Sequence, residues 1–297
     1  MKILLFGKGG QVGWELQRSL APLGELIALD FDSTDHHADF SRPAALADTV
    51  RALRPDVIVN AAAHTAVDRC ESEPEFAAKL NAEAPRVLAA EAAALGAWLV
   101  HYSTDYVFDG SGSAPRDEAA ATGPLSVYGR TKLDGENHIR ASGCKHLIFR
   151  TSWVYAARGG NFARTMLKLA AERDALSVID DQFGAPTGAD LLADITAHAL
   201  RSVQREPQLG GTYHAVAAGE TSWHGYARFV IEWARASGVP VKVAATAIGA
   251  VPTSAYPTAA RRPLNSRLDT RKLRSAFCLT LPDWQHGVQR MLQEITQ

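Results

Sequence analysis

Tyr128 and Lys132 stand four positions apart in the run Ser126-Val-Tyr-Gly-Arg-Thr-Lys132, downstream of Thr104. If this run is helical, the phenol and the ammonium project from one face of the helix. A free phenol titrates near ~10, so a neighbouring positive charge is expected to help it exchange protons at neutral pH. Thr104 would hydrogen-bond a carbonyl oxygen and stabilise developing alkoxide charge. Together the three side chains predict hydride transfer to or from a carbonyl, with Tyr128 as the proton donor. Taken singly, each is more typical of an ordinary structural residue, since Tyr128 and Lys132 could simply lie on an amphipathic helix.

A glycine-rich segment near the start of the chain suits a dinucleotide. Gly7, Gly10 and Gly13 have the spacing G-x-x-G-x-x-G and join the first apolar run to the first expected helix. The first glycine permits the turn, the second lets the backbone approach a pyrophosphate, and the third lets the helix pack on the strand. The helix N-terminus then faces the phosphates. Although a glycine trio alone is weak, its position at this junction predicts NADPH or NADH as the cofactor, with Lys132 holding the nicotinamide ribose.

Asp30 ends the second apolar run, where a carboxylate can bond both ribose hydroxyls of an NAD-type cofactor. The same carboxylate should repel a 2′-phosphate, which Lys8 would offset. An ordinary surface acid is the alternative, and the choice between NADH and NADPH stays open. Small side chains in Asn60-Ala-Ala-Ala-His-Thr65 would let the backbone approach the cofactor, and Asp39-Phe40 are expected to flank the adenine.

Composition places the chain in an ordinary globular class. It has 297 residues, of which 46% are hydrophobic and 21% charged, with a net charge of −1. No charged block recommends a nucleic acid or an anionic membrane as a partner. Cys70, Cys144 and Cys278 are far apart and lack metal spacing, which favours a reduced cytoplasmic compartment. No apolar stretch approaches the ~20 residues that span a bilayer, and the apolar start is too short for a signal peptide.

The elements that must position these residues alternate along the first half of the chain. Short apolar runs typical of strands buried on both faces alternate with longer amphipathic stretches, which predicts an α/β fold with a Rossmann-like, doubly wound parallel sheet. The expected strands are 3–6, 26–29, 57–59, 98–100 and 147–149, followed by 177–179 and 212–216. The expected helices are 11–20, 43–53, 74–95, 126–141, 161–172, 189–203, 222–237 and 283–295.

The alternation loosens after about residue 150. We therefore expect a dinucleotide-binding domain over 1–150, to which later segments, roughly 176–230, return. A smaller, interleaved C-terminal lobe over 151–297 would bind the substrate. Residues 250–263 carry three prolines without periodicity and are expected to form a loop.

The motifs together resemble the dTDP-4-dehydrorhamnose reductase family of the extended short-chain dehydrogenase/reductase superfamily. The resemblance covers nearly the whole chain. It rests on Phe6-Gly-Lys-Gly-Gly-Gln-Val-Gly13, Asn60-Ala-Ala-Ala-His-Thr-Ala-Val-Asp68, Ser103-Thr-Asp-Tyr-Val-Phe108, Arg150-Thr-Ser-Trp-Val-Tyr155, Asp181-Gln-Phe-Gly-Ala-Pro-Thr187 and Ala260-Arg-Arg-Pro263.

This resemblance implies reduction of the C4 ketone of dTDP-4-dehydro-L-rhamnose with NADPH or NADH, a step in making lipopolysaccharide precursors. It implies Thr104, Tyr128 and Lys132 as catalytic residues and a dTDP-sugar as the partner molecule. The residues implied at the cofactor are Gly10, Gln11, Val12, Asp30, Asp39, Phe40, Ala62, Ala63, His64 and Tyr102. Those implied at the sugar nucleotide are Thr104, Asp105 and Trp153, with Arg261 and Arg262 on its diphosphate.

Some members of the resembled family dimerise through Mg²⁺, which implies a homodimer with Glu15, Asp190 and Glu294 as metal ligands. Asp190 stands where the family commonly has Glu, and its side chain is one methylene shorter. From spacing alone, these three residues are surface acids.

Other functions of the same fold stay open to different degrees. Sugar-nucleotide 4,6-dehydratases resemble this chain but carry an Asp-Glu pair after the threonine, whereas Tyr106 follows Asp105 here. A nucleotide-sugar epimerase would turn over without added reductant. A non-catalytic subunit, similar to the regulatory subunit of methionine adenosyltransferase, would bind a partner and show no cofactor oxidation.

Overall fold

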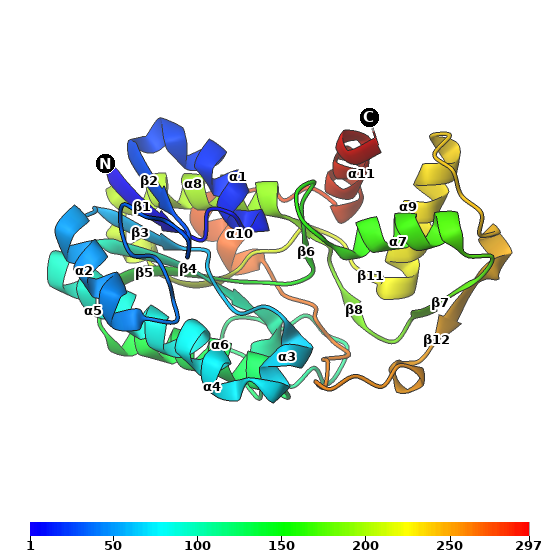
Figure 1. Ribbon diagram of the computed structural model, residues 1–297, viewed down its shortest axis with the longest axis horizontal. Helices are drawn as coiled ribbons and strands as arrows, with labels where there is room; N and C mark the ends of the chain where they lie inside the picture. Colours follow the sequence, from blue (N-terminus) through cyan, green and yellow to red (C-terminus); the bar gives the residue numbers. More distant parts are fainter. Residues whose placement is uncertain (297) are drawn as a thin grey trace.

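The apolar runs of the first half become neighbouring strands of one parallel sheet (Figure 1). We describe the protein from a computed structural model that covers residues 1–296. The sheet has the strand order β10-β5-β4-β3-β1-β2. Its strands are β1 (Lys2–Phe6), β2 (Glu25–Leu29), β3 (Val57–Asn60), β4 (Trp98–Thr104), β5 (Lys145–Thr151) and β10 (Gly211–His214). The predicted α/β class with a parallel sheet is confirmed.

Alternating side chains divide the sheet's packing between two helical layers. Ile3 and Leu5 contribute to the core on one face, and Leu4 and Phe6 to the core on the other. The first core is completed by α1 (Gln11–Leu20), α8 (Ala189–Arg205) and α10 (Arg271–Phe277). The second is completed by α2 (Pro43–Leu53), α5 (Ala84–Leu95) and α6 (Val127–Ala141). Strands buried on both faces explain the continuous apolar runs in the sequence.

The strand order reverses beside β1, since β2 pairs with one of its edges and β3 with the other. Ligands of doubly wound sheets bind outside the carboxyl ends of the strands at such a reversal. The turn after β1 carries Gly7 at φ +86, and a Cβ there would lie 2.8 Å from the carbonyl carbon of Ala61. The glycine loop and the segment after β3 therefore lie directly against each other.

The expected single helix over 74–95 is interrupted. The chain forms α4 (Pro74–Ala78), a π-helical turn (Lys79–Glu83) and then α5. The turn buries Asn81, whose side chain accepts from the His64 N–H at 2.8 Å and donates to the His64 carbonyl at 3.1 Å. Such π-helical turns are frequent at functional sites, and this one holds the segment that follows β3.

A second core lies at the other end of the molecule (Figure 1). Its main elements are α7 (Phe162–Glu172), α9 (Trp223–Ala236), α11 (Trp284–Thr296), β7 (Leu176–Ile179) and β12 (Ile248–Val251). Short strands link it to the rest of the chain: β6 (Val154–Tyr155), β8 (Phe183–Gly184), β9 (Thr187–Gly188) and β11 (Thr221–Ser222). Strand β12 pairs with β7, so the expected loop over 250–263 begins with the last residues of a strand.

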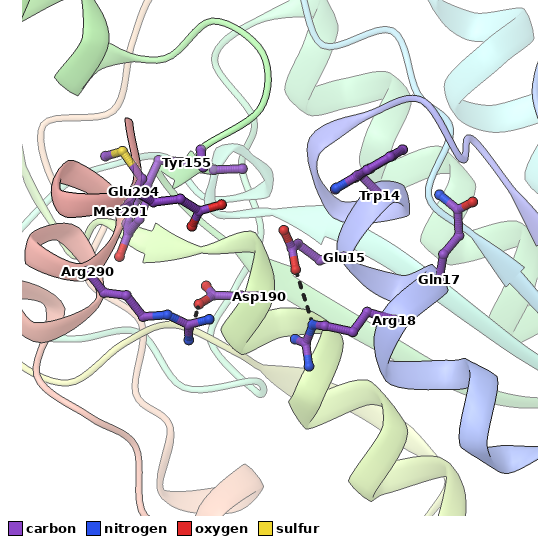
Figure 2. A pocket seen from close by; sticks show the side chains of 11 residues that line it. Trp14, Glu15, Gln17, Arg18, Tyr155, Asp190, Arg290, Met291 and Glu294 are labelled. Carbon is purple, nitrogen blue, oxygen red and sulfur yellow. Dashed lines mark hydrogen bonds and ion pairs between the residues drawn. The ribbon is translucent and has the colours of Figure 1, made fainter. Parts of the chain in front are cut away.

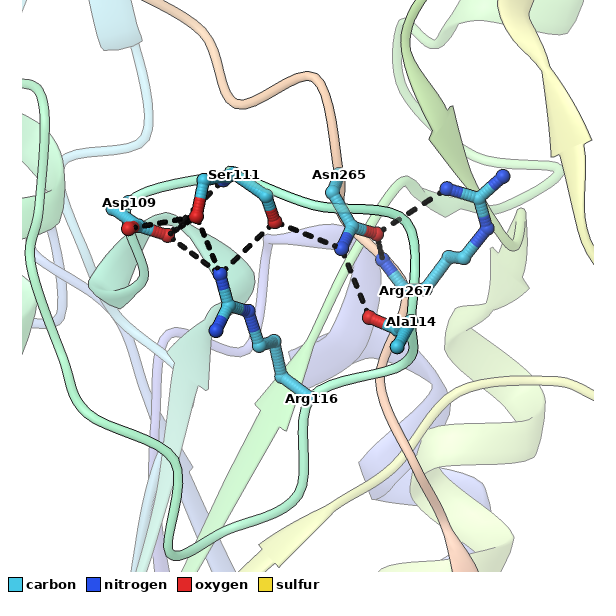
Figure 3. A network of polar contacts seen from close by, with 6 residues as sticks. All are labelled: Asp109, Ser111, Ala114, Arg116, Asn265 and Arg267. Carbon is cyan, nitrogen blue, oxygen red and sulfur yellow. Dashed lines mark hydrogen bonds and ion pairs between the residues drawn. The ribbon is translucent and has the colours of Figure 1, made fainter.

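A polar network ties the loop after β4 to a segment near the C-terminus (Figure 3). Arg116 donates to Asp109 at 2.8 Å and to the carbonyl of Ser111 at 2.9 Å. Asn265 donates to the carbonyls of Ser111 and Ala114 at 3.3 and 2.9 Å. These contacts fix the approach of the C-terminal segment to the carboxyl ends of the strands.

Within residues 1–296, no helix combines the length and apolar character needed to cross a membrane.

Candidate active site

The start of α6 places the two predicted catalytic side chains. The hydroxyl of Ser126 accepts from the N–H of Gly129 at 3.1 Å, which caps the helix and starts it at Val127. A Cβ at Gly129 would lie 2.2 Å from the carbonyl oxygen of Tyr106, so glycine allows α6 to pack tightly against the turn after β4. Tyr128 is thereby brought beside the end of β4, where Thr104 lies.

Tyr128 is half-buried, and its ring meets that of Tyr106 edge to face at 5.5 Å. Burial raises the pKa of its phenol, and a hydrogen bond with Thr104 opposes that rise. Asp105 and Cys70 add smaller upward shifts in the pKa. Lys132 is not among the groups in residues 1–296 that shift the pKa of Tyr128, so tuning of the phenol by Lys132 stays a prediction.

Thr104 lies within a short hydrogen-bonded chain. Its hydroxyl donates to Asp105 Oδ1 at 3.0 Å and accepts from the N–H of Tyr106 at 3.2 Å. Asp105 is 2% exposed, and its pKa is raised by burial to about 6 although hydrogen bonds from Ser266 and Thr104 oppose the rise. Because Asp105 is buried behind Thr104, its position favours an action through the threonine over direct contact with a sugar.

Lys132 is 2% exposed and points toward β4. Its Nζ donates to the carbonyl of Tyr102 at 2.6 Å and lies 3.3 Å from Nε2 of His101. Burial lowers the pKa of Lys132 to about 8, and the charge of Glu136 opposes this. Glu136 is itself neutralised, because Arg150 binds it bidentately at 2.7 and 2.9 Å.

Asn60 and His101 belong to this site but were not identified from the sequence. The strand register sets them side by side, and Asn60 Nδ2 lies 3.0 Å from His101 Nδ1. Burial first, and then the charge of Lys132, lowers the pKa of His101 well below its ordinary value. The signal available in the sequence was a polar residue within or ending each of two neighbouring apolar runs.

The glycine loop has the form that a dinucleotide phosphate requires. A Cβ at Gly13 would lie 1.9 Å from the carbonyl oxygen of Gly7, so only glycine fits there. Helix α1 follows Gly10 and leaves the backbone N–H groups of Gln11 and Val12 at its first turn. Asp30 lies against this loop, accepting from the N–H of Gly9 at 2.8 Å. These residues therefore fit the pyrophosphate and ribose of the predicted cofactor.

The remaining residues predicted at the cofactor lie in several environments. Ala62 and Ala63 are half-buried in the segment after β3, and His64 lies 3.3 Å from Glu73 through Nε2. Asp39 accepts from the N–H and hydroxyl of Ser41, both at 2.8 Å.

Two of these predicted cofactor residues direct their side chains into the core. Phe40 is 4% exposed and packs on Phe6 at 5.5 Å. The Tyr102 hydroxyl lies 2.6 Å from the Thr196 hydroxyl, so any role of Tyr102 at the cofactor moves to its backbone.

On the predicted substrate side, Trp153 adopts φ +49 and stacks on Trp223 with ring centroids 3.7 Å apart. The sequence predicted Arg262 at a diphosphate, and here its guanidinium binds Asp68 at 2.7 and 3.2 Å. Arg261 is exposed on the same loop. The Asp68–Arg262 pair joins α3 (Val67–Ser72) to the C-terminal segment and was not expected.

Glu15, Asp190 and Glu294 line one pocket of about 380 Å³ (Figure 2). Glu15 pairs with Arg18 at 3.5 Å, and Asp190 pairs with Arg290 at 3.2 Å. Among the described residues, no three His, Cys, Asp or Glu side chains are arranged to hold a metal ion. The three predicted ligands therefore line one pocket, but Glu15 and Asp190 are each paired with an arginine, which does not fit a divalent cation.

Comparison with known proteins gives matches over the whole length. The family described as RmlD substrate binding domain matches residues 1–297. The dTDP-4-dehydrorhamnose reductase of Escherichia coli K12 is 61% identical over 295 residues, covering 99% of this chain and 98% of that protein.

Two solved structures are also similar to this chain over nearly its whole length. A crystal structure of a dTDP-4-dehydrorhamnose reductase from Clostridium acetobutylicum has a TM-score of 0.88 at 35% identity and covers 100% of both chains. The enzyme of that name from Bacillus anthracis, in complex with NADP, has a TM-score of 0.86 at 32% identity and covers 99% of both.

Proposed function

Because the chain belongs to the RmlD family of dTDP-4-dehydrorhamnose reductases, we propose that it reduces the C4 ketone of dTDP-4-dehydro-L-rhamnose to dTDP-L-rhamnose. The observation that carries this proposal is the geometry at the carboxyl end of β4, where the Ser126 cap and the close approach of Gly129 to Tyr106 bring the Tyr128 phenol beside the Thr104 hydroxyl. This pair provides a proton donor and a hydrogen-bonding hydroxyl where ligands of such sheets bind.

In the proposed reaction, Tyr128 donates its proton to the ketone oxygen as that oxygen becomes an alcohol. Its raised pKa keeps the phenol protonated at neutral pH, which suits a donor. Thr104 holds the phenol and the reacting oxygen near each other. Lys132, fixed by the carbonyl of Tyr102, supplies a basic nitrogen at the cofactor side of the site.

The proposed cofactor is NADPH or NADH, which supplies the hydride when bound. Gly7, Gly10 and Gly13, with the N–H groups of Gln11 and Val12, would hold the pyrophosphate. Asp30 would hold the adenosine ribose, since its carboxylate lies beside the loop. Closely related chains that carry the same name, one of them with NADP, support this assignment.

The division into lobes follows from the same proposal. Residues 1–150 would bind the dinucleotide with the help of returning segments, of which α8 packs on the main sheet and β10 forms its edge strand beside β5. The second core would carry the sugar-nucleotide contacts, with Trp153 and Trp223 as an aromatic platform.

The wider setting is also part of the proposal. We place the enzyme in the cytoplasm, where its product would serve as a lipopolysaccharide precursor, and we expect a homodimer. Sedimentation velocity with and without Mg²⁺ tests the dimer and its metal dependence together. A dimer that is unchanged by a chelator would agree with the arginine pairs at Glu15 and Asp190.

The decisive experiment combines purified protein with dTDP-4-dehydro-L-rhamnose and each reduced cofactor. The loss of absorbance at 340 nm, together with the appearance of dTDP-L-rhamnose, is the expected result. Turnover without added reductant would indicate an epimerase. If neither cofactor is oxidised while the chain still binds NADPH, a non-catalytic binding subunit becomes the better assignment.

A further inference from the structure

Four groups form a continuous chain from the end of β3 to α6. The backbone N–H of Ala62 donates to Asn60 Oδ1 at 3.0 Å. Asn60 Nδ2 then lies 3.0 Å from His101 Nδ1, and His101 Nε2 lies 3.3 Å from Lys132 Nζ. Asn60, His101 and Lys132 are each at most 2% exposed, so water has little access to any of these bonds.

The direction of the first bond dictates the others. A backbone N–H can only donate, so Asn60 must present its oxygen to Ala62 and its NH₂ group to His101. His101 Nδ1 must then accept, and a neutral imidazole that accepts at Nδ1 carries its proton on Nε2. The burial that lowers the pKa of His101 excludes the doubly protonated ring. His101 therefore faces Lys132 with an N–H donor.

An ammonium group has three donors and no acceptor, so it meets the N–H of His101 unfavourably. A neutral amine has a lone pair that accepts this N–H while one of its own hydrogens binds the Tyr102 carbonyl at 2.6 Å. We propose that His101 is a positioning residue that faces Lys132 with an N–H donor, fixed by Asn60, and thereby favours the neutral amine of Lys132 over its ammonium form.

The other charged groups around Lys132 do not cancel the effect of the His101 N–H on the amine. Glu136, one turn further along α6, favours the ammonium, but Arg150 from β5 and Arg140 from α6 bind its carboxylate at 2.7 to 2.9 Å. Burial lowers the pKa of Lys132 to about 8, while the charge of Glu136 opposes this. A basic group that titrates close to the working pH can both take up and release a proton, which is what a group serving Tyr128 needs.

The inference deepens the proposed reductase function, but its first test does not depend on it. In protein labelled with ¹⁵N at histidine, the two ring nitrogens of His101 are distinguished by their chemical shifts as protonated or unprotonated. We expect the proton on Nε2 at neutral pH in the wild-type chain. A proton on Nδ1, or on both nitrogens, would overturn the inference whatever the enzyme's substrate.

Asn60→Asp should reverse the chain of bonds, because a carboxylate accepts from both Ala62 and His101. His101 would then carry its proton on Nδ1 and accept from the ammonium of Lys132. The loss of kcat/KM at high pH should move upward by ~1 pH unit. His101→Leu is the control background. In it, the Asn60→Asp carboxylate still adds its negative charge, but no imidazole is present whose proton could move between ring nitrogens. An equal upward movement in that background, or an unmoved profile in Asn60→Asp, would refute the role of His101.

If the chain shows no reductase activity, the ¹³Cε shift of Lys132 replaces the rate profile, with the signal assigned by Lys132→Met. This readout separates a failed positioning role from a failed proposed function, because it reports the titration of the amine directly.

Discussion

The hydroxyl of Thr104 donates to the carboxylate of Asp105 across 3.0 Å, and this bond sets the direction in which the threonine proton points. The threonine oxygen is then free to accept from Tyr128. Asp105 therefore orients the pair that carries the proposed chemistry, although it is itself buried.

Asp105 should make folding stability depend on pH. The pKa of Asp105 is about 6 in the folded chain against an ordinary 3.8, so between these values the folded chain holds a proton that the unfolded chain has lost. The contribution of protonated Asp105 to the free energy of unfolding is therefore fully present below about pH 4 and is lost as the pH rises through about 6. Relative to Asp105→Asn, the wild type should lose ~3 kcal/mol across this window. Urea unfolding of both chains from pH 4 to 7 measures the difference, and a constant difference contradicts the prediction.

Tyr128→Phe should lower kcat by roughly 10²–10⁴-fold, because it removes the proton donor while keeping the ring. The Kd of NADPH, measured by fluorescence titration, should change less than twofold. Tyr106→Phe is the matched control, since it removes the hydroxyl of the ring that lies edge to face with Tyr128 and keeps that ring. Equal losses in the two variants would point to packing rather than proton donation.

Asp30→Ala should weaken NADH binding more than NADPH binding. The carboxylate can hold the ribose hydroxyls of NADH but repels the phosphate of NADPH, so the two losses should differ by ~10-fold in Kd. The variant also frees the Gly9 N–H, and that loss is common to both cofactors. Isothermal titration with each cofactor separates the two effects. An equal loss for both cofactors would mean that Asp30 only supports the loop.

Arg262→Ala should raise the KM for the sugar nucleotide more than Asp68→Ala does. Both variants break the ion pair, but only the first removes the guanidinium that is predicted to bind the diphosphate. A double-mutant cycle on KM measures the coupling. Identical effects of the two single variants, with no further effect in the double variant, would show that Arg262 serves the ion pair alone.

Glu136→Gln should destabilise the fold by ~3–5 kcal/mol, because it leaves the buried guanidinium of Arg150 without its charge partner. Arg140→Ala removes the more exposed partner of the same carboxylate and should cost ~1 kcal/mol or less. Chemical denaturation measures both. Similar losses in the free energy of unfolding for the two variants would show that the buried ion pair stabilises the fold no more than the exposed one.

Much of the fold follows from local sequence. The helices at Gln11–Leu20 and Pro43–Leu53 were predicted to their observed ends, because their apolar periodicity and flanking residues agree. The two-residue strands β6, β8, β9 and β11 were missed, since two residues carry no period. The interruption at Lys79–Glu83 was also missed, although Pro85, which has no N–H to donate, stands just after it in the sequence.

In the candidate site, too, features set by local sequence were predicted and features set by distant contacts were missed. The spacing of Tyr128 and Lys132 predicts a shared helix, and the structure has both on α6. The contact between Asn60 and His101 depends on the register of β3 against β4, which no local pattern encodes. Arg262 was predicted at a ligand because its charge is visible in the sequence, whereas its partner Asp68 lies far away along the chain.

Strand β10 forms the edge of the main sheet beside β5, although it is contributed by Gly211–His214. During synthesis on the ribosome, β5 would therefore wait with an unpaired edge until residues 211–214 have emerged. A nascent or truncated chain that stops earlier would expose that edge to other chains, and we expect such fragments to need chaperones or to aggregate.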